Sequence, residues 1–382
     1  MKITRQTQNL IIYFGIIILA LVFLYIGNNI AAQGMVVVLQ NTDGELSEAR
    51  VRSILDINTE SEEWWSSTTV TFEAQIIKGV RKNEIITAAQ SYSSFDAAEP
   101  AEIKAGDKVL LVYTSPHLDS SEEWYYSDHV RINKLIILGV VFVVLLLIFG
   151  RIKGLNAILS LGFTCIAIFA VFIPAILSGK NIYLWSVLIC IYVIIFTLFI
   201  LNGVNKKSIA AAAGCFGGVI VAGVITLFMN GALRMTGWIN SESIYLVGLQ
   251  TETPIDLIAI IFAGIIIGAV GAIMDVSVSI SSALWELKEK APGLSFGGLV
   301  KSGINIGEDI MGSMANTLVL AYIGSSLTII LLLIVYSGSF SDLLNRELVT
   351  VEILQALVGS LGILLTMPLT ALICGALYSR KR

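Results

Sequence analysis

The sequence predicts an α-helical polytopic membrane protein of about eight transmembrane helices, with a small extracytoplasmic all-β domain between the first and second helices. Three observations lead to this prediction. Hydrophobic residues make up 56% of the chain and charged residues only 14%. Several apolar runs reach about 17 residues or more, the length at which a helix crosses a bilayer. One sizeable hydrophilic segment, residues 30–130, separates the first apolar run from the others.

The first apolar run is Leu10–Ile26, and it follows Lys2 and Arg5. A cleaved signal peptide is one interpretation of this pattern. The apolar core is long for a signal peptide, which favours an uncleaved anchor instead. We therefore expect residues 1–29 to form an N-terminal membrane helix that begins in the cytoplasm.

The hydrophilic segment 30–130 has the pattern of a small β-barrel or sandwich. In Val70–Ile77, apolar and polar residues alternate as in a half-buried strand. Further strands are expected at Met35–Gln40, Glu84–Gln90, Lys108–Tyr113 and Trp124–Tyr126, and a short helix at Ser47–Ile57. Between Asp43 and Asp128 the chain holds 17 acids and 7 bases, so this domain offers no basic surface for nucleic acid.

Residues 131–382 are predicted to form a multi-helix membrane domain. Its spans are expected at Leu135–Phe149, Leu155–Leu177, Tyr183–Leu201, Ile209–Met229, Ile255–Met274, Thr317–Tyr336 and Ile353–Leu377. Alternate loops carry most of the Lys and Arg residues, for example Lys206 and Lys207. By the positive-inside rule, both termini are expected in the cytoplasm and residues 30–130 outside.

The segment 263–324 differs from the other spans because polar residues interrupt its apolar background. One helical stripe comprises Gly264, Gly268, Gly271, Asp275, Ser279, Ser282 and Glu286. A second stripe comprises Ser302, Asn305, Asp309, Ser313 and Asn316, and Glu308 adjoins it. Two helices with such stripes can approach closely and place their polar groups against each other.

Two interpretations of these acids remain open. A charged group at the bilayer centre costs from about 2.5 to more than 10 kcal/mol, so an acid at membrane depth is expected to be buried, paired or functional. Alternatively, Asp275 and Glu308 lie at the cytoplasmic boundary and cap helix ends in water. In that case Gly307–Asp309 begins a helix and places its acids in the first turn.

Small residues elsewhere favour close helix packing. Gly214 and Gly218 on one span, like Gly264, Gly268 and Gly271 on another, permit close backbone contact. The four cysteines lie inside predicted spans, where they serve as small apolar fillers, and they are Cys165, Cys190, Cys215 and Cys374.

No cofactor or metal site is expected. A group of potential ligands occurs near the end of the hydrophilic segment: His117, Asp119, Glu122, Glu123, Asp128 and His129. These residues lack a metal-ligand spacing, so a solvated acidic loop is the preferred interpretation.

Three functional hypotheses follow from these features. The first is a permease or secondary transporter in which Asp275 and Asp309 bind an ion or a small substrate, assisted by Asn305, Asn316, Ser279, Ser313 and Glu308. The second is a non-transporting assembly or sensor protein that acts through its external domain. The third, an intramembrane aspartyl hydrolase, lacks a convincing catalytic motif. The chain also has no Walker-type phosphate loop, so an enzyme is not expected.

Three segments resemble the signature segments of the YibE/F-like bacterial membrane proteins. They are GAIMDVSVSISSALWEL, GEDIMGSMANTLVLAYIG and LTMPLTALICG. The layout, with an external domain before the membrane body, resembles the longer, YibE-type members, and the likeness covers roughly residues 100–382. Family members are described as permeases or as membrane proteins of unassigned activity. The resemblance implies a bacterial plasma membrane, and either homo-oligomers or pairing with a shorter, YibF-type homologue.

Overall fold

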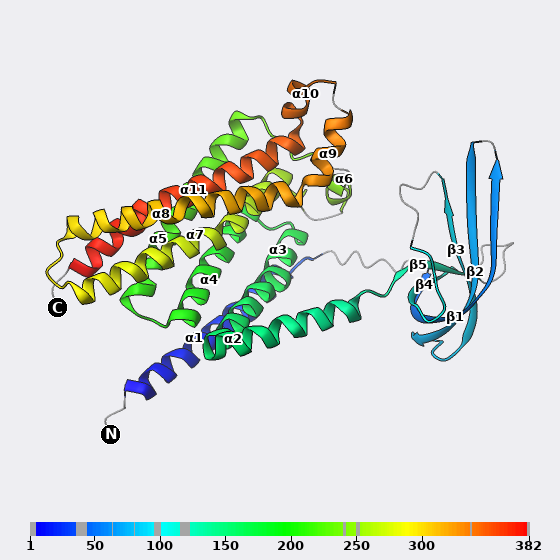
Figure 1. The fold of residues 1–382 in the computed structure, drawn as a ribbon, viewed down its shortest axis with the longest axis horizontal. Coiled ribbons are helices and arrows are strands. Elements are labelled where there is room, and N and C mark those ends of the chain that lie inside the picture. The colour runs from blue at the N-terminus through cyan, green and yellow to red at the C-terminus, as the bar shows by residue number, and fades with distance from the viewer. Residues whose placement is uncertain are drawn as a thin grey trace. The chain divides into compact units, whose positions relative to one another are not determined.

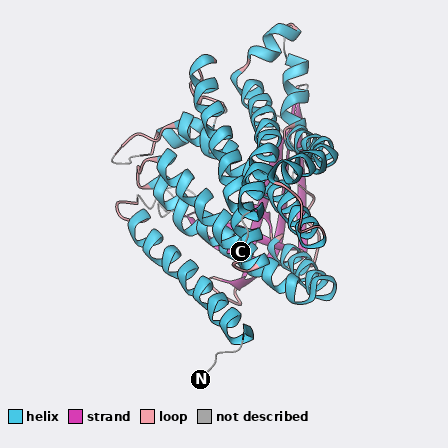
Figure 2. Cartoon of the chain, turned by 90° about the vertical axis from the view of Figure 1, so that its left-hand side faces the viewer, coloured by secondary structure: helices cyan, strands magenta, loops and turns pink. Residues whose placement is uncertain are grey.

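The computed structural model describes residues 5–35, 44–62, 64–79, 81–94, 101–114, 123–239, 242–249, 253–336 and 338–379. The chain divides into two compact units. The first comprises Met1–Val36 and Leu146–Arg382, and the second Val37–Leu145. Within the described residues, every strand belongs to the second unit, whereas the first unit is built from helices (Figures 1 and 2).

The second unit contains a closed five-stranded barrel with the strand order β1-β2-β3-β5-β4. Its strands are β1 (Gly44–Glu62), β2 (Trp65–Lys78), β3 (Ile85–Ser93), β4 (Lys108–Thr114) and β5 (Glu123–His129). Neighbouring strands are antiparallel except β3 and β5, which are parallel. Alternate residues of β2 point inward, and Phe72, Ala74 and Ile76 are fully buried there. Closure leaves the barrel without a free sheet edge.

Four of the expected strands are confirmed as parts of β2, β3, β4 and β5. The expected strand Met35–Gln40 lies almost wholly outside the described residues. The expected helix Ser47–Ile57 is wrong, because this segment is the central part of β1 and pairs with both β2 and β4. Register shifts after Glu48, Val51 and Ile54 interrupt the two-residue alternation, which hid the strand in the sequence.

The helical unit begins with α1 (Arg5–Ala31) and resumes within α2 (Ile132–Ala167). The remaining helices are η1 (Ile168–Phe172, a π-helix), α3 (Ile173–Leu177), α4 (Ile182–Asn202), α5 (Lys206–Ala232), α6 (Glu242–Val247), α7 (Leu257–Lys290), α8 (Phe296–Ser325), α9 (Leu327–Tyr336), α10 (Phe340–Asn345) and α11 (Glu347–Ser379). Four of the long helices start at a polar side chain that accepts a backbone N–H of the first turn: Asn181, Asn205, Asp256 and Ser295.

Six described helical segments are long and apolar enough to cross a membrane, or up to seven if α8 and α9 form one bent span. The segment from Ile132 to Leu177 counts as one of these, although Arg151 within it has the non-helical angles φ 49° and ψ −126°. Several apolar helices therefore place the chain in a membrane. The number of eight spans stays a prediction.

One expected span has a different shape in the structure. The segment Thr317–Tyr336 is not one straight helix, because the chain bends by 62° between α8 and α9 near Ser326. Its first half instead continues a helix that began at Phe296. Figure 1 shows α8 lying alongside α11, and α5 and α7 pack against α11 as well. The two predicted polar stripes lie on α7 and α8, within this group of four helices.

Candidate functional site

Helix α8 is held against α7 and α11 by two buried glycines. A Cβ atom on Gly303 would lie 2.7 Å from the Ala371 Cβ and 2.9 Å from the Leu284 Cδ1. A Cβ on Gly307 would meet the side chain of Met367. The backbones therefore approach more closely at these points than larger residues allow.

The opposite side of α8 is a polar face that the chain leaves uncovered. We define the α8 polar face by four exposed residues: Asn305, Asp309, Ser313 and Asn316. Glu308 is exposed beside it, and Gly312 within it has open space where a side chain would be. At 100° per residue, Asp309 lies about 140° around the helix from the midpoint of Gly303 and Gly307. This carboxylate thus points away from the helices on which α8 packs.

The predicted stripe on α7 is also largely open. Gly264, Gly271 and Asp275 are exposed, and a Cβ on either glycine would meet no other residue. Gly268 differs, because a Cβ there would lie 2.9 Å from the hydroxyl of Tyr322 on α8. Ser279 is half-buried. Helix α8 therefore approaches the stripe at Gly268 through Tyr322, and both Gly268 and Asp275 remain exposed.

The glycines on α5 allow close contact with α7 and α11. A Cβ on Gly214 would meet Thr370, and one on Gly218 would meet Thr366 and Ile273. Both glycines are buried. They lie at the junction of the three helices that form the centre of the bundle.

Contacts between neighbouring helices place the two aspartates at similar levels along the bundle. The Ser281 hydroxyl donates to the Lys207 carbonyl oxygen (2.7 Å), so Ser281 lies level with the start of α5. Asp275 precedes Ser281 by six residues, or about 9 Å of helix. On α11, the Thr370 hydroxyl lies 3.3 Å from the Ser277 hydroxyl of α7. Met367 precedes Thr370 by about one helical turn, farther from the Lys207 level, and it adjoins Gly307 of α8. Asp309 therefore lies within about one helical turn of the level of Asp275.

The structure does not join the two carboxylates. Among the described residues, neither Asp275 nor Asp309 takes part in a hydrogen bond or an ion pair, and Asp309 points away from α7. The boundary interpretation also needs correction. Helix α8 begins at Phe296 with Ser295 as its N-cap, so Glu308 and Asp309 lie more than three turns inside the helix and not in its first turn.

A buried hydroxyl network between α7 and α11 was missed in the sequence. Ser277 lies 3.3 Å from Thr370, and Ser281 lies 2.9 Å from the Tyr378 hydroxyl. The stripe predicted from the sequence contains Ser279 and Ser282 instead, which are only half-buried on the open side of the helix. The spacing in the sequence could have indicated this network. Ser277 and Ser281 are four residues apart and therefore share one face of α7, away from the predicted stripe.

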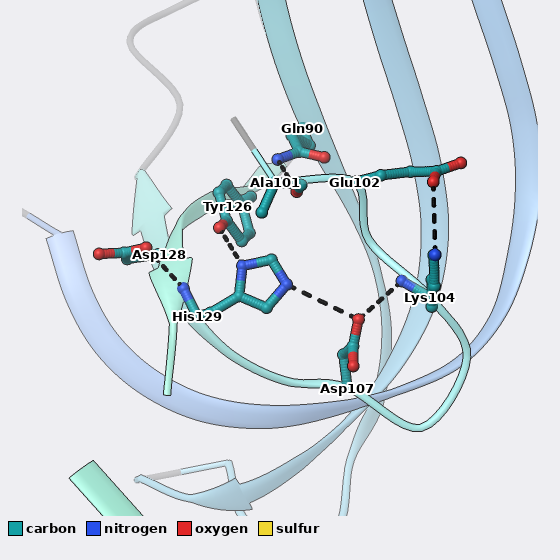
Figure 3. Close-up of polar contacts among 8 residues, drawn as sticks. All are labelled: Gln90, Ala101, Glu102, Lys104, Asp107, Tyr126, Asp128 and His129. Atoms are coloured by element: carbon teal, nitrogen blue, oxygen red, sulfur yellow. Dashed lines mark hydrogen bonds and ion pairs between the residues drawn. The ribbon is translucent and has the colours of Figure 1, made fainter. Parts of the chain in front are cut away.

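The barrel holds a second polar cluster, around His129 (Figure 3). The Tyr126 hydroxyl and His129 Nδ1 share a hydrogen bond of 2.5 Å, and His129 Nε2 lies 3.6 Å from an oxygen of Asp107. The same Asp107 oxygen accepts the Lys104 backbone N–H at 2.8 Å. Burial, followed by the nearby charge of Asp128, raises the pKa of Tyr126. The cluster ties the end of β5 to the turn before β4.

This cluster does not build a metal site. Within the part of the chain that the structure describes, no group of three or more His, Cys, Asp or Glu residues is arranged to hold a metal ion. Of the potential ligands noted in the sequence, His117, Asp119 and Glu122 lie outside the described residues. Of the described members, Glu123 begins β5, and Asp128 and His129 are engaged with Arg131, Tyr126 and Asp107.

The ion pair between Asp128 and Arg131 gives a pH prediction. A hydrogen bond from Arg131 (2.6 Å), followed by one from the His129 backbone N–H, lowers the pKa of Asp128 below 3.8. This stabilisation is present above pH 3.8 and is lost as the pH falls through the lower pKa of the folded state. We expect Arg131→Gln to remove it, so the stability difference between Arg131→Gln and the unchanged chain should be present at neutral pH and vanish in strong acid.

The measurement is the resistance of the barrel to a protease as a function of pH, with an acid-active protease at the low end. Arg346→Gln is the matched control, because Arg346 forms a comparable exposed ion pair with Asp342 in the helical unit (3.1 Å). A difference between Arg131→Gln and the unchanged chain that persists at every pH would contradict this assignment.

The comparisons with known proteins address the helical unit. The model of the YibE/F-like protein family matches residues 138–380, more than half of the chain. The chain belongs to the YibE/F-like family. The family match includes α7, α8 and α11 and therefore the α8 polar face, whereas α1 and the barrel lie outside it. The family predicted from the sequence is confirmed. Comparisons of this YibE/F-like chain with curated proteins and with solved structures found no match.

Proposed function

We propose that the chain is a membrane permease in which Asp275 and Asp309 provide the binding groups for a cation. The observation that carries this proposal is the α8 polar face. It presents a carboxylate and two carboxamides on a long helix whose other side packs into the bundle. Carboxylate and amide oxygens are suitable ligands for cations.

The depth of the aspartates supports this role. Asp256 caps the start of α7, and Ser281 is level with Lys207, so charged residues mark two levels about 37 Å apart along the helix. This span is slightly longer than a hydrocarbon core of about 30 Å. Asp275 lies about 9 Å inward from the Lys207 level. Carboxylates at such a depth are costly in contact with lipid, and they typically mark ion pathways.

The uncovered faces indicate that the site is completed by another subunit. A second copy of the chain would cover the α8 polar face through the same surface on both copies, as in a two-fold dimer. A shorter family member, which the resemblance implies, would carry the same helix. The exposed glycines, Gly264 and Gly271 on α7 and Gly312 on α8, would permit close approach there.

The proposed orientation follows the positive-inside rule. Lys206, Lys207, Lys288 and Lys290 lie near the same end of the bundle, because Ser281 contacts the Lys207 carbonyl oxygen there. Tyr378, near the C-terminus, contacts Ser281 at that end too. We place this end in the cytoplasm and the barrel on the outer side of a plasma membrane.

Cation binding can be measured without knowing the transported species. A ligand that binds only the folded protein raises the melting temperature by mass action. We expect one of Li⁺, Na⁺, K⁺ or Mg²⁺ to raise the melting temperature of the purified chain relative to choline at the same ionic strength. Asp275→Asn and Asp309→Asn should each abolish this increase. In proteoliposomes, the flux of that cation should fall at least about tenfold in both variants, as expected when a charged ligand worth about 1.4 kcal/mol or more is lost.

Asp342→Asn is the matched control, because Asp342 is an exposed aspartate that pairs with Arg346 on α10, outside the proposed site. It should retain both the cation effect and the flux. The proposal is wrong if no cation raises the melting temperature, or if the effect survives in both Asp275→Asn and Asp309→Asn. That result would favour the non-transporting role instead.

A further inference from the structure

A polar cavity of about 450 Å³ lies where α4 ends, within the helical unit. It is lined by Asn202 and Gly203 at the end of α4, by Asn156 of α2, and by Tyr13 and Ile16 of α1. One hydrogen-bonded chain connects the three helices around it. The Tyr13 hydroxyl donates to Asn156 Oδ1 (2.9 Å), and Asn156 Nδ2 donates to the Ile200 carbonyl oxygen (3.0 Å).

Acceptor oxygens at the end of α4 remain free around this cavity. Tyr13 and Asn156 donate within the chain just described, and Asn205 Nδ2 donates to the Asn202 carbonyl oxygen (2.7 Å). Among the described residues, neither the Leu201 carbonyl oxygen nor the Asn202 side chain has a partner. The last carbonyl groups of a helix also carry its negative partial charge. The cavity therefore favours a cationic hydrogen-bond donor.

The surroundings indicate that this donor belongs to a lipid. Ile12 and Ile16 form an apolar wall along α1, and Ile12 is 45% exposed, so the cavity has an apolar side. On the other side, the loop leads directly into the N-terminus of α5 with Lys206 and Lys207. A helix N-terminus and two lysines attract an anionic group. The negative end of α4 and the positive end of α5 thus lie next to each other, beside the apolar wall of α1. This arrangement matches a lipid that has a zwitterionic headgroup and an acyl chain.

We propose that this cavity binds an aminophospholipid through the primary ammonium group of its headgroup. The ammonium would donate to the Leu201 carbonyl oxygen and to Asn202 Oδ1. The lipid phosphate would lie toward Lys206, and an acyl chain along Ile12 and Ile16. A quaternary ammonium has no N–H group, so a choline headgroup lacks the donors that these oxygens need. This inference is independent of the proposed permease function.

The test is native mass spectrometry of the full chain in detergent, titrated with phosphatidylethanolamine and phosphatidylcholine of identical acyl chains. We expect phosphatidylethanolamine to bind about tenfold more tightly, as for a hydrogen bond from a charged donor. Affinity should fall stepwise through the N-methyl and N,N-dimethyl lipids as N–H groups are lost. Equal binding of the two parent lipids, or a methylation series without a trend, would overturn the proposal.

Two further experiments locate the binding site and show whether the bound amine belongs to a lipid. Asn202→Leu should reduce the ratio of the affinities for phosphatidylethanolamine and phosphatidylcholine to about one. Asn345→Leu on α10, far along the chain from the cavity, should leave this ratio unchanged. If Asn202→Leu kept the full preference for phosphatidylethanolamine, the cavity would not be the binding site. Soluble phosphoethanolamine should compete only weakly, because it lacks the acyl chain. If it displaced the lipid at equal concentration, the occupant would be a free amine and the lipid proposal would be wrong.

Discussion

Replacing Gly218 with valine is expected to unfold much of the membrane bundle under mild heating. A Cβ atom at this position would meet the Thr366 side chain and would lie 3.0 Å from Ile273 Cγ2. Valine would add two further methyl groups at the junction of α5, α7 and α11. Overpacking of this kind costs about 1–3 kcal/mol and sometimes more, and here it would separate three helices that share one core. We expect a lower melting temperature and a reduced yield of monodisperse protein.

The melting temperature can be followed by the reaction of a thiol dye with the buried cysteines. Cys190, Cys215 and Cys374 are all buried in the bundle, so they report its opening. Gly231→Val is the matched control, because Gly231 lies on the same helix but has open space around its Cα. Equal melting temperatures for Gly218→Val and Gly231→Val would contradict the close contact among the three helices.

Replacing Phe72 with alanine is expected to remove most of the stability of the barrel. Phe72 is fully buried at the centre of β2, opposite Ile54 of β1 and Ala88 of β3. Truncation of a buried phenylalanine costs about 3–5 kcal/mol, because it loses apolar contacts and leaves a cavity. Domains of this size are stable by about 5–15 kcal/mol in total. We therefore expect the barrel to become sensitive to a protease at much lower urea concentrations.

The same experiment tests whether the two units fold independently. Thr71→Ala, at the neighbouring and only half-buried position, is expected to change the urea dependence of proteolysis little. Because the barrel and the helical unit are separate compact units, the melting of the buried cysteines should be unaffected by Phe72→Ala. A parallel loss of bundle stability would show that the barrel supports the membrane unit.

The sequence allowed prediction of those elements whose pattern depends on local surroundings. Val70–Ile77 alternates because one face of the strand is inside the barrel, and the apolar run Ile255–Met274 predicted a helix that forms the first part of α7. The segment Ser47–Ile57 failed for a tertiary reason. It has three register shifts against β2 and also pairs with β4, and such pairing overrides local propensity.

The candidate site was predictable in composition but not in arrangement. The sequence alone determined that the chain enters a membrane, that acids and amides occur within its apolar helices, and that it resembles the YibE/F-like family. Only the tertiary structure decided where these groups point. A helical stripe defines a face without naming its neighbour, so nothing in the sequence showed that Gly303 and Gly307 attach α8 to the bundle. That attachment turns Asp309 outward, because side chains on opposite sides of one helix point in opposite directions.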